Sequence, residues 1–208
     1  MQFLKKKYIA VDIEMAIQII EKPDWVTWNQ IQEVVSAAHK QNWERGVVML
    51  NSKLTGEEIS SKLGSMGKMF VALDGEKVVG TAGFKIKEAS LWFGTRNFGY
   101  CCFAAILPEY NGKGIYKLLC EVREKFAVSQ GVEMMMFDTH ERNSHVIQVN
   151  KHVGFEFVDY KPCKDHNNVV MVKWLSVCPY SQKTLALHYW IEKIRVRISK
   201  RIKGLTQK

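Results

Sequence analysis

The spacing of apolar residues along the chain predicts an ordered series of strands and helices. Between residues 27 and 41 apolar side chains recur every three or four positions, which is typical of an amphipathic helix. From residue 69 the period changes to two, and the continuous apolar run at 98–107 indicates a strand buried on both faces. The predicted strands cover residues 8–13, 69–73, 78–84, 98–107, 132–137, 155–160 and 169–175, and the long predicted helices cover 27–41, 112–130 and 143–153.

A capping box predicts one further, short helix. Thr55 is placed to cap its first turn while Glu58 reaches back to the cap, and Gly64 ends the helix. The resulting order of elements, with strands and helices mixed and no linker between them, is that of one α/β domain. We expect this domain to cover residues 1–178 and a C-terminal helix to cover residues 179–208.

The basic charge of the chain is concentrated in the C-terminal segment. Residues 182–208 hold eight lysines and arginines against one glutamate, which is +7 of the net charge of +9. The opposite face of the predicted helix carries Leu187, Ile191, Ile194, Ile198 and Ile202. Packing on the chain's own domain or in a homodimer is favoured, because apolar helix stripes usually bury against protein. Peripheral contact with an anionic membrane is a second interpretation, and the localised charge makes nucleic acid the weakest.

The composition indicates a globular protein of a reducing compartment. Hydrophobic residues make up 47% of the chain and charged residues 25%, as in average soluble domains, and the longest uncharged run is too short to span a bilayer. The five cysteines include no Cys-x-x-Cys pair, which argues against a structural zinc site and against a disulfide framework. We therefore expect reduced thiols, no metal and a cytoplasmic location.

The segment between the predicted strand 98–107 and the predicted helix 112–130 is the main candidate for ligand binding. Gly112 and Gly114 lie two residues apart, where the strand ends and the helix begins. Glycines let the backbone approach a ligand closely, and the first N–H groups of a helix attract an anion. A pyrophosphate fits such a loop, although Gly-x-Gly also occurs in ordinary strand-to-helix turns.

A second motif lies at residues 138–155. Asn143, Ile147, Asn150 and Gly154 are spaced by four, three and four residues, so they share one face of a helix. Together the two stretches resemble the GCN5-related N-acetyltransferase (GNAT) superfamily. The glycine loop resembles the acetyl-CoA signature of that family, and the second stretch resembles its helix from an asparagine to a Tyr-Glu-Lys-Leu-Gly-Phe-like end.

The resemblance implies a fold and a donor site. The fold would be α+β, with a mixed, mostly antiparallel central sheet that is flanked by helices and whose fourth and fifth strands splay apart. The pantetheine arm of acetyl-CoA (coenzyme A) would enter that gap and pair with the fourth strand, and the pyrophosphate would bind the glycine loop. The predicted acetyl-CoA contacts are Ala105, Ile106, Leu107, Asn111, Gly112, Lys113, Gly114, Ile115, Tyr116, Asn143 and Asn150.

Three of these residues depart from the family pattern. Asn111 replaces an arginine or glutamine, and Tyr116 replaces a small residue. Asn150 stands where many members have a tyrosine that protonates the departing thiolate, and an amide cannot supply that proton. Either a water or another side chain serves as the acid, or the thiolate leaves unprotonated.

The resemblance further implies an acetyltransferase that moves the acetyl group directly to the primary amine of a small molecule. Residues 98–107 contain no carboxylate, so the candidates for the base are Asp138 and His140, at the end of the fifth strand. Each also has a structural interpretation: Asp138 as a residue that only orients the approach to the following helix, and His140 as a solvated loop residue. The oxyanion would be bound by a backbone N–H near Ile106 or Leu107.

One alternative function is a GNAT-like module that binds acyl-CoA, or associates with a membrane, without catalysis. Asn150 and the absence of a carboxylate from the fourth strand suit this alternative. Trp25, Trp28 and Trp43, in the N-terminal helical region, either wall an acceptor pocket or pack helices together.

Overall fold

The computed structural model describes residues 17–44, 46–47, 53–91, 94–163 and 165–175, and single positions at 187, 190, 191 and 194. The elements are β1 (Ile17–Glu21), α1 (Trp28–Glu44), α2 (Gly56–Leu63), β2 (Lys68–Asp74), β3 (Lys77–Leu91), β4 (Gly94–Ile106), the 3-10 turn η2 (Pro108–Tyr110), α3 (Ile115–Ser129), β5 (Met134–His140), α4 (Ser144–His152), β6 (Glu156–Pro162) and β7 (Asn167–Trp174). The predicted strand at 8–13 and most of the predicted C-terminal helix lie outside the described residues.

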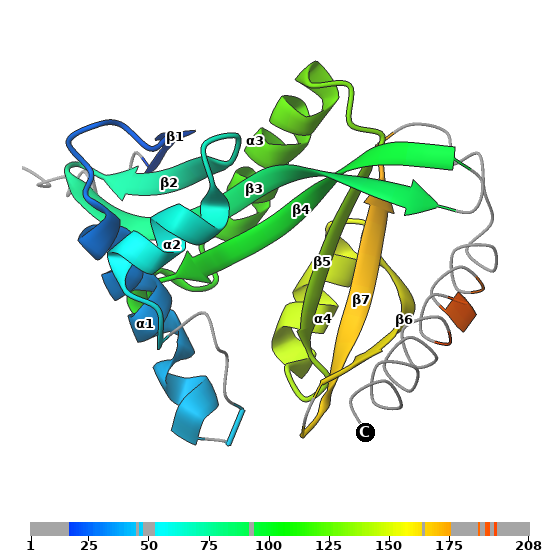
Figure 1. The fold of residues 1–208 in the computed structure, drawn as a ribbon. Coiled ribbons are helices and arrows are strands. Elements are labelled where there is room, and N and C mark those ends of the chain that lie inside the picture. The colour runs from blue at the N-terminus through cyan, green and yellow to red at the C-terminus, as the bar shows by residue number, and fades with distance from the viewer. Residues whose placement is uncertain are drawn as a thin grey trace, which may run out of the picture.

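One seven-stranded sheet, in the order β1-β2-β3-β4-β5-β7-β6, forms the centre of the molecule. Every neighbouring pair is antiparallel except β4 and β5, which are parallel, and this confirms the predicted fold class. β4 and β5 pair only where Gly99 lies opposite Met135 and Tyr100 lies opposite Met136. Beyond this point the two strands diverge, as Figure 1 shows, so the predicted splay of the fourth and fifth strands is present.

Helices cover both faces of the sheet and enclose two apolar cores. On one face α1 and α2 bury Ile31, Val35 and Ile59 against strands β2 to β4. On the other face α3 and α4 pack against the core that holds Phe84 and Met135 (Figure 1). The two helix pairs flank the point where β4 and β5 separate. Side chains from both faces of the sheet can therefore contact a ligand at this point.

The capping box is formed as predicted and fixes the start of α2. The Thr55 hydroxyl accepts a hydrogen bond from the Glu58 N–H at 3.2 Å, and the Glu58 carboxylate accepts one from the Thr55 N–H at 2.8 Å. The other predicted helices agree with α1, α3 and α4 within a few residues. None of the described helices is long and apolar enough to cross a membrane.

Three sequence predictions about strands need correction. Strand β1 (Ile17–Glu21) was not predicted, and β3 continues to Leu91 instead of ending near residue 84. Its continuation, Lys85-Ile86-Lys87, alternates between polar and apolar residues and so presents lysines to one face of the sheet. The predicted burial of β4 on both faces is wrong, since buried and half-buried residues alternate along its second half. The half-buried positions include Tyr100 and Cys102, which line a cleft.

Candidate active site

The loop before α3 has a backbone conformation that favours glycine. Gly112 and Gly114 have φ of 77° and 76°, in the left-handed region, and Ile115 begins the helix. A Cβ atom at either glycine would meet no atom within 4 Å, so the loop is open on its outer side. The first turn of α3 contains no acidic residue. Its free N–H groups and positive helix end are therefore available for a pyrophosphate.

A β-bulge distorts β4 opposite β3, close to this loop. Thr81 pairs with Ala105 and Gly83 pairs with Cys102, so β4 carries one extra residue. Phe103, in the bulge, has a φ of 50°, and the buried Thr81 hydroxyl donates a hydrogen bond to the Phe103 carbonyl at 2.8 Å. A non-glycine residue in this conformation is strained, and such strain concentrates at functional sites. The bulge changes which β4 groups face the diverging strand β5.

The N–H groups of Ile106 and Leu107, the two predicted oxyanion donors, point to opposite edges of β4. The N–H of Leu107 donates to the Val79 carbonyl at 2.9 Å, on the β3 side. Successive N–H groups of a strand point to opposite edges, so the N–H of Ile106 points toward β5. Because β5 has diverged there, this N–H faces the gap between the strands.

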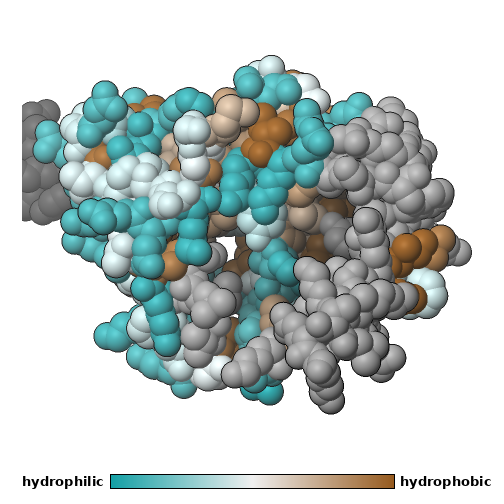
Figure 2. All heavy atoms as spheres, viewed as in Figure 1, coloured by the Kyte–Doolittle hydropathy of each residue, from teal (hydrophilic) through white to brown (hydrophobic). Residues whose placement is uncertain are grey.

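A cleft of about 310 Å³ passes between β4 and β5. Figure 2 shows the surface hollowed between the part of the molecule that carries α1 and α2 and the part that carries α4. On the α1/α2 face, which we call the acceptor half, it is lined by His39, Lys62, Lys85, Lys87, Tyr100 and Asp138. On the α3/α4 face, which we call the donor half, it is lined by Tyr116, Arg123, Val146 and Asn150. Two reactants entering from opposite faces would meet between the two halves.

Asp138 is the centre of the acceptor half. Its two oxygens accept hydrogen bonds from the Tyr100 hydroxyl and from the Asn168 side-chain amide, each at 2.6 Å. The Lys161 ammonium lies 3.6 Å from the second oxygen. Burial, followed by the charge and the hydrogen bond of Asp138, raises the pKa of Tyr100. Tyr100 therefore stays protonated and donates a hydrogen bond to the Asp138 carboxylate.

Lysines lie close to the hydrogen-bonded pair of Tyr100 and Asp138 and make the acceptor half positive. The Lys87 ammonium lies 4.0 Å from the centre of the Tyr100 ring, and the Lys85 ammonium lies 5.8 Å from it. Lys85 also donates to the Lys62 carbonyl at 2.7 Å. Burial, together with the charges of Lys85 and Lys161, lowers the pKa of Lys87. The crowding of these ammonium groups favours an anionic group on the molecule that binds here.

The donor half contains a hydrogen-bonded pair from two helices. The Tyr116 hydroxyl donates to the Asn150 side-chain oxygen at 2.9 Å, and the Asn150 amide nitrogen donates to the Val146 carbonyl at 2.8 Å. Burial raises the pKa of Tyr116. The side chain of Tyr116 thus points into the cleft, toward the residue that replaces the tyrosine of the family pattern.

A sequence model of the acetyltransferase (GNAT) family matches residues 28–155 of this chain. The matched part spans α1 to α4 and includes the glycine loop and both halves of the cleft. The chain belongs to the GNAT acetyltransferase family. As a GNAT protein it is an acetyltransferase with acetyl-CoA as the acetyl donor, and the open glycine loop before α3 fits that donor.

Solved GNAT structures share this fold at low sequence identity. The ribosomal-protein-S18-alanine N-acetyltransferase of Escherichia coli is 14% identical, with a TM-score of 0.60 over 79% of this chain and 97% of that one. PaiA N-acetyltransferase from Thermoplasma acidophilum, in complex with coenzyme A, is 18% identical, with a TM-score of 0.58 over 77% of this chain and 99% of that one. An aminoglycoside 6'-N-acetyltransferase complexed with coenzyme A is 14% identical, with a TM-score of 0.57 over 78% and 99%. No protein among the curated sequences matches the chain.

Two predicted site residues of this GNAT domain lie beside the cleft without lining it. His140 stacks on the ring of His166, with the ring centres 4.2 Å apart, and accepts a hydrogen bond from the Arg142 N–H at 3.0 Å. Burial and the neighbouring His166 lower the pKa of His140. Asn143 is buried, and its amide donates to the hydroxyl of Thr139, which does line the cleft, at 3.2 Å. Both residues shape the turn between β5 and α4.

Several cleft residues were missed by sequence reasoning. The lysines of β3 had a signal, because their alternation with Ile86 continues the strand pattern. Arg123 also had one, since it lies four residues after the buried Leu119 on a helix with an apolar stripe. Tyr100 and His39 had no such signal in the sequence, because only the folded chain places them in the same cleft as Asp138. The pKa of His39 is lowered by burial, so its imidazole is neutral near pH 7.

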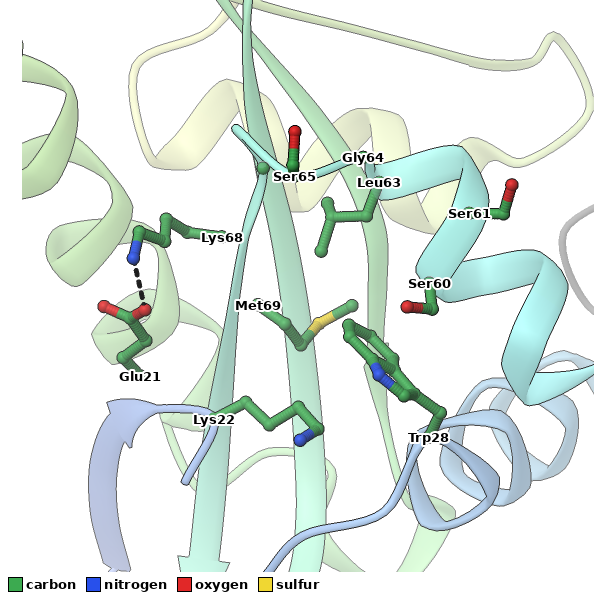
Figure 3. A pocket seen from close by; sticks show the side chains of 11 residues that line it. Glu21, Lys22, Trp28, Ser60, Ser61, Leu63, Gly64, Ser65, Lys68 and Met69 are labelled. Atoms are coloured by element: carbon green, nitrogen blue, oxygen red, sulfur yellow. Dashed lines mark hydrogen bonds and ion pairs between the residues drawn. The ribbon is translucent and has the colours of Figure 1, made fainter. Parts of the chain in front are cut away.

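A second hollow, of about 490 Å³, lies away from the GNAT cleft. Figure 3 shows it beside the end of β1, with Trp28 and Met69 facing each other and an ion pair of 2.6 Å between Lys68 and Glu21. Trp28 thus lines this hollow, while Trp25 and Trp43 are exposed. None of the three tryptophans lines the cleft between β4 and β5. Among the described residues, no group of three His, Cys, Asp or Glu side chains is placed to hold a metal ion.

Proposed function

We propose that this GNAT protein transfers an acetyl group directly from acetyl-CoA to the primary amine of a small molecule. The observation that supports the proposal most is the cleft through the sheet, with Asp138 in one half and the Tyr116–Asn150 pair in the other. A direct transfer is favoured over an acyl-cysteine route. Burial raises the pKa of Cys102 to about 12, so this cleft thiol is not a thiolate near neutral pH.

The donor would bind along the glycine loop and β4. In this proposal the backbone of residues 111–116 holds the pyrophosphate, and residues 105–107 accompany the pantetheine arm. The N–H of Ile106, which faces the gap, would stabilise the negative charge that develops on the thioester carbonyl oxygen. Asn150 would line the path of the arm from α4, and Asn143 would act beside it through Thr139, which lines the cleft.

Asp138 is the proposed base, and it would also bind the amine. A carboxylate has about four lone-pair sites, so Asp138 can accept from an ammonium while it keeps Tyr100 and Asn168 as donors. It would then take the proton that the amine loses. His140 is the second candidate from the sequence, and it would act through the β5–α4 turn because it does not line the cleft.

The lysines of the acceptor half refine the substrate class. A small amine that also carries a carboxylate or phosphate would place that anion near Lys85 and Lys87. The same positive charges would disfavour the ammonium form of the amine and so favour its neutral, nucleophilic form. We propose an anionic small-molecule amine on this basis.

The arrangement of the whole chain is also a proposal. Residues 1–178 would form the GNAT domain, and residues 179–208 would be an appended basic segment that contacts a second copy of the chain or a membrane surface. Leu187, Trp190 and Ile191 are between 40% and 58% exposed, which leaves apolar surface for such a contact. A cytoplasmic location suits the free thiols of the described cysteines.

A mass-spectrometric screen of amines with acetyl-CoA tests the proposal. We expect N-acetylation of amines that bear an anionic group, and its loss in Asp138→Asn but not in Glu156→Gln, an exposed acid on β6. The alternative function, a module that binds acyl-CoA without catalysis, predicts coenzyme binding with no acetylated product from any amine. Equal turnover in the two variants would contradict the role of Asp138.

A further inference from the structure

Arg123 is a buried cation in the donor half of the cleft. It lies on α3, is 1% exposed and lines the cleft. Its Nη2 atom donates to the sulfur of Cys120 at 3.1 Å, while its Nε and Nη1 atoms have no hydrogen-bond partner. A buried guanidinium without a partner for its donors is costly, so such a group normally meets an anion.

The groups around Arg123 do not supply that anion. On β4, burial raises the pKa of the Cys101 thiol to about 11, so it is neutral. On α3, the Tyr116 ring centre lies 6.0 Å from the guanidinium carbon, and burial raises the pKa of this phenol as well. Glu124, the next residue on α3, is already paired with Lys173 of β7. Among the described residues, no ion pair joins Arg123 to a carboxylate.

Bound acetyl-CoA would bring one group that becomes an anion near Arg123, the thioester sulfur. This step rests on the proposed function, in which the acceptor enters from the half that holds Asp138 and the coenzyme from the half that holds Arg123. The thioester sulfur lies on the coenzyme side of the reacting carbonyl, and therefore in the donor half. Tyr116 can donate a hydrogen bond there, but its raised pKa makes it a poor source of a proton.

We propose that Arg123 receives the thiolate of coenzyme A as it leaves. The acceptor nitrogen forms a bond to the thioester carbonyl carbon, and the carbonyl oxygen takes up negative charge. When the C=O double bond re-forms, the carbon–sulfur bond breaks and its electron pair stays on sulfur. The proton lost by the amine goes to Asp138, and the sulfur departs unprotonated as the counter-ion of the guanidinium. The positive charge of Arg123 thus replaces the proton that Asn150 cannot supply.

The test compares binding of coenzyme A and desulfo-coenzyme A by calorimetry between pH 6 and 9. If the thiolate is the bound form, coenzyme A gains affinity over its desulfo analogue as the pH rises, beginning below the ordinary thiol pKa of about 8.5. We expect this gain to fall at least tenfold in Arg123→Met, to be partly kept in Arg123→Lys, and to be unchanged in Lys125→Met, an exposed residue of α3. Thiolate absorption in the ultraviolet measures the same ionisation directly.

Three results would overturn the proposal. The first is a flat difference between the two coenzymes in the native protein, which needs no variant and so does not depend on whether a variant folds. The second is an unchanged gain in Arg123→Met. The third is an Arg123-dependent preference for succinyl-CoA over acetyl-CoA without a thiolate effect, which would identify an acyl carboxylate as the anion. If neither coenzyme binds, the proposed function itself fails, and this is distinct from a failure of the Arg123 assignment.

Discussion

Replacement of Gly114 by glutamate tests two properties of the glycine loop, its left-handed backbone conformation and its proposed binding of the pyrophosphate. At φ 76° a side chain costs about 1–2 kcal/mol of folding stability, because the left-handed region disfavours a Cβ atom. The space around Gly114 is open, so no steric clash adds to this cost. For a chain of this size each kcal/mol lowers the melting temperature by about 2–4 °C, and the variant should melt about 2–8 °C lower.

The added carboxylate should also repel the pyrophosphate of the coenzyme. Like charges about 5–6 Å apart at a partly screened surface cost about 1–3 kcal/mol, which is about a fivefold to 150-fold loss of affinity. Gly131→Glu is the matched control, because Gly131 has a φ of 67°, equally open surroundings and a place at the opposite end of α3. Calorimetry with coenzyme A should show normal affinity in Gly131→Glu, with a similar loss of stability in both variants. Equal affinities in the two variants would refute the placement of the pyrophosphate.

Four further predictions concern the cleft, its surroundings and the C-terminal segment. Asp138→Asn should reduce kcat by about 100- to 10,000-fold with little change in acetyl-CoA affinity, and a kcat near that of the native enzyme would refute its role as base. Asn150→Ala should weaken acetyl-CoA binding and cost about 1 kcal/mol of stability, because it leaves the half-buried Tyr116 hydroxyl without its partner. It should keep both limbs of the pH–rate profile, and loss of one limb with normal affinity would identify Asn150 with the acid. Burial lowers the pKa of His39 below 6.5, so as the pH falls the unfolded chain takes up a proton before the folded chain does. The stability of the folded protein should therefore decrease as the pH drops below 6.5. Thermal melts of His39→Gln should show a smaller decrease over the same pH range, and an identical decrease would contradict the shift. A chain that ends at Ser181 should still bind acetyl-CoA, and calorimetry that finds a folded truncated chain without affinity would place the C-terminal segment in the donor site.

The parts of the fold that local chemistry determines were predictable from the sequence. The capping box at Thr55 and the positive φ of Gly112 and Gly114 follow from short-range preferences, and all three are present. The long amphipathic stretches gave α1, α3 and α4 for the same reason. Strand β1 was missed because its residues, Ile17–Glu21, lack a clear alternation, and its identity as a strand depends on pairing with β2.

The composition of the cleft was less predictable, because it depends on contacts between distant segments. Tyr100 and Asp138 are 38 residues apart in sequence and meet only where β4 and β5 pair for two residues before they diverge. The motif places Tyr116 at the end of the predicted phosphate loop, but it could not show that the Tyr116 hydroxyl donates to Asn150, 34 residues further along the chain. Local patterns predicted the glycine loop and the helix that follows it, whereas the partners of each polar group required the three-dimensional fold.

A crystal structure of the protein with coenzyme A tests the central claim most directly. The account predicts the pyrophosphate on the backbone of residues 111–116, the pantetheine arm along β4 in the gap beside β5, and the sulfur in the donor half near Arg123. Coenzyme A bound in the hollow beside Trp28 and Met69, or a cleft that stays empty at saturating coenzyme, would contradict the placement of acetyl transfer between β4 and β5.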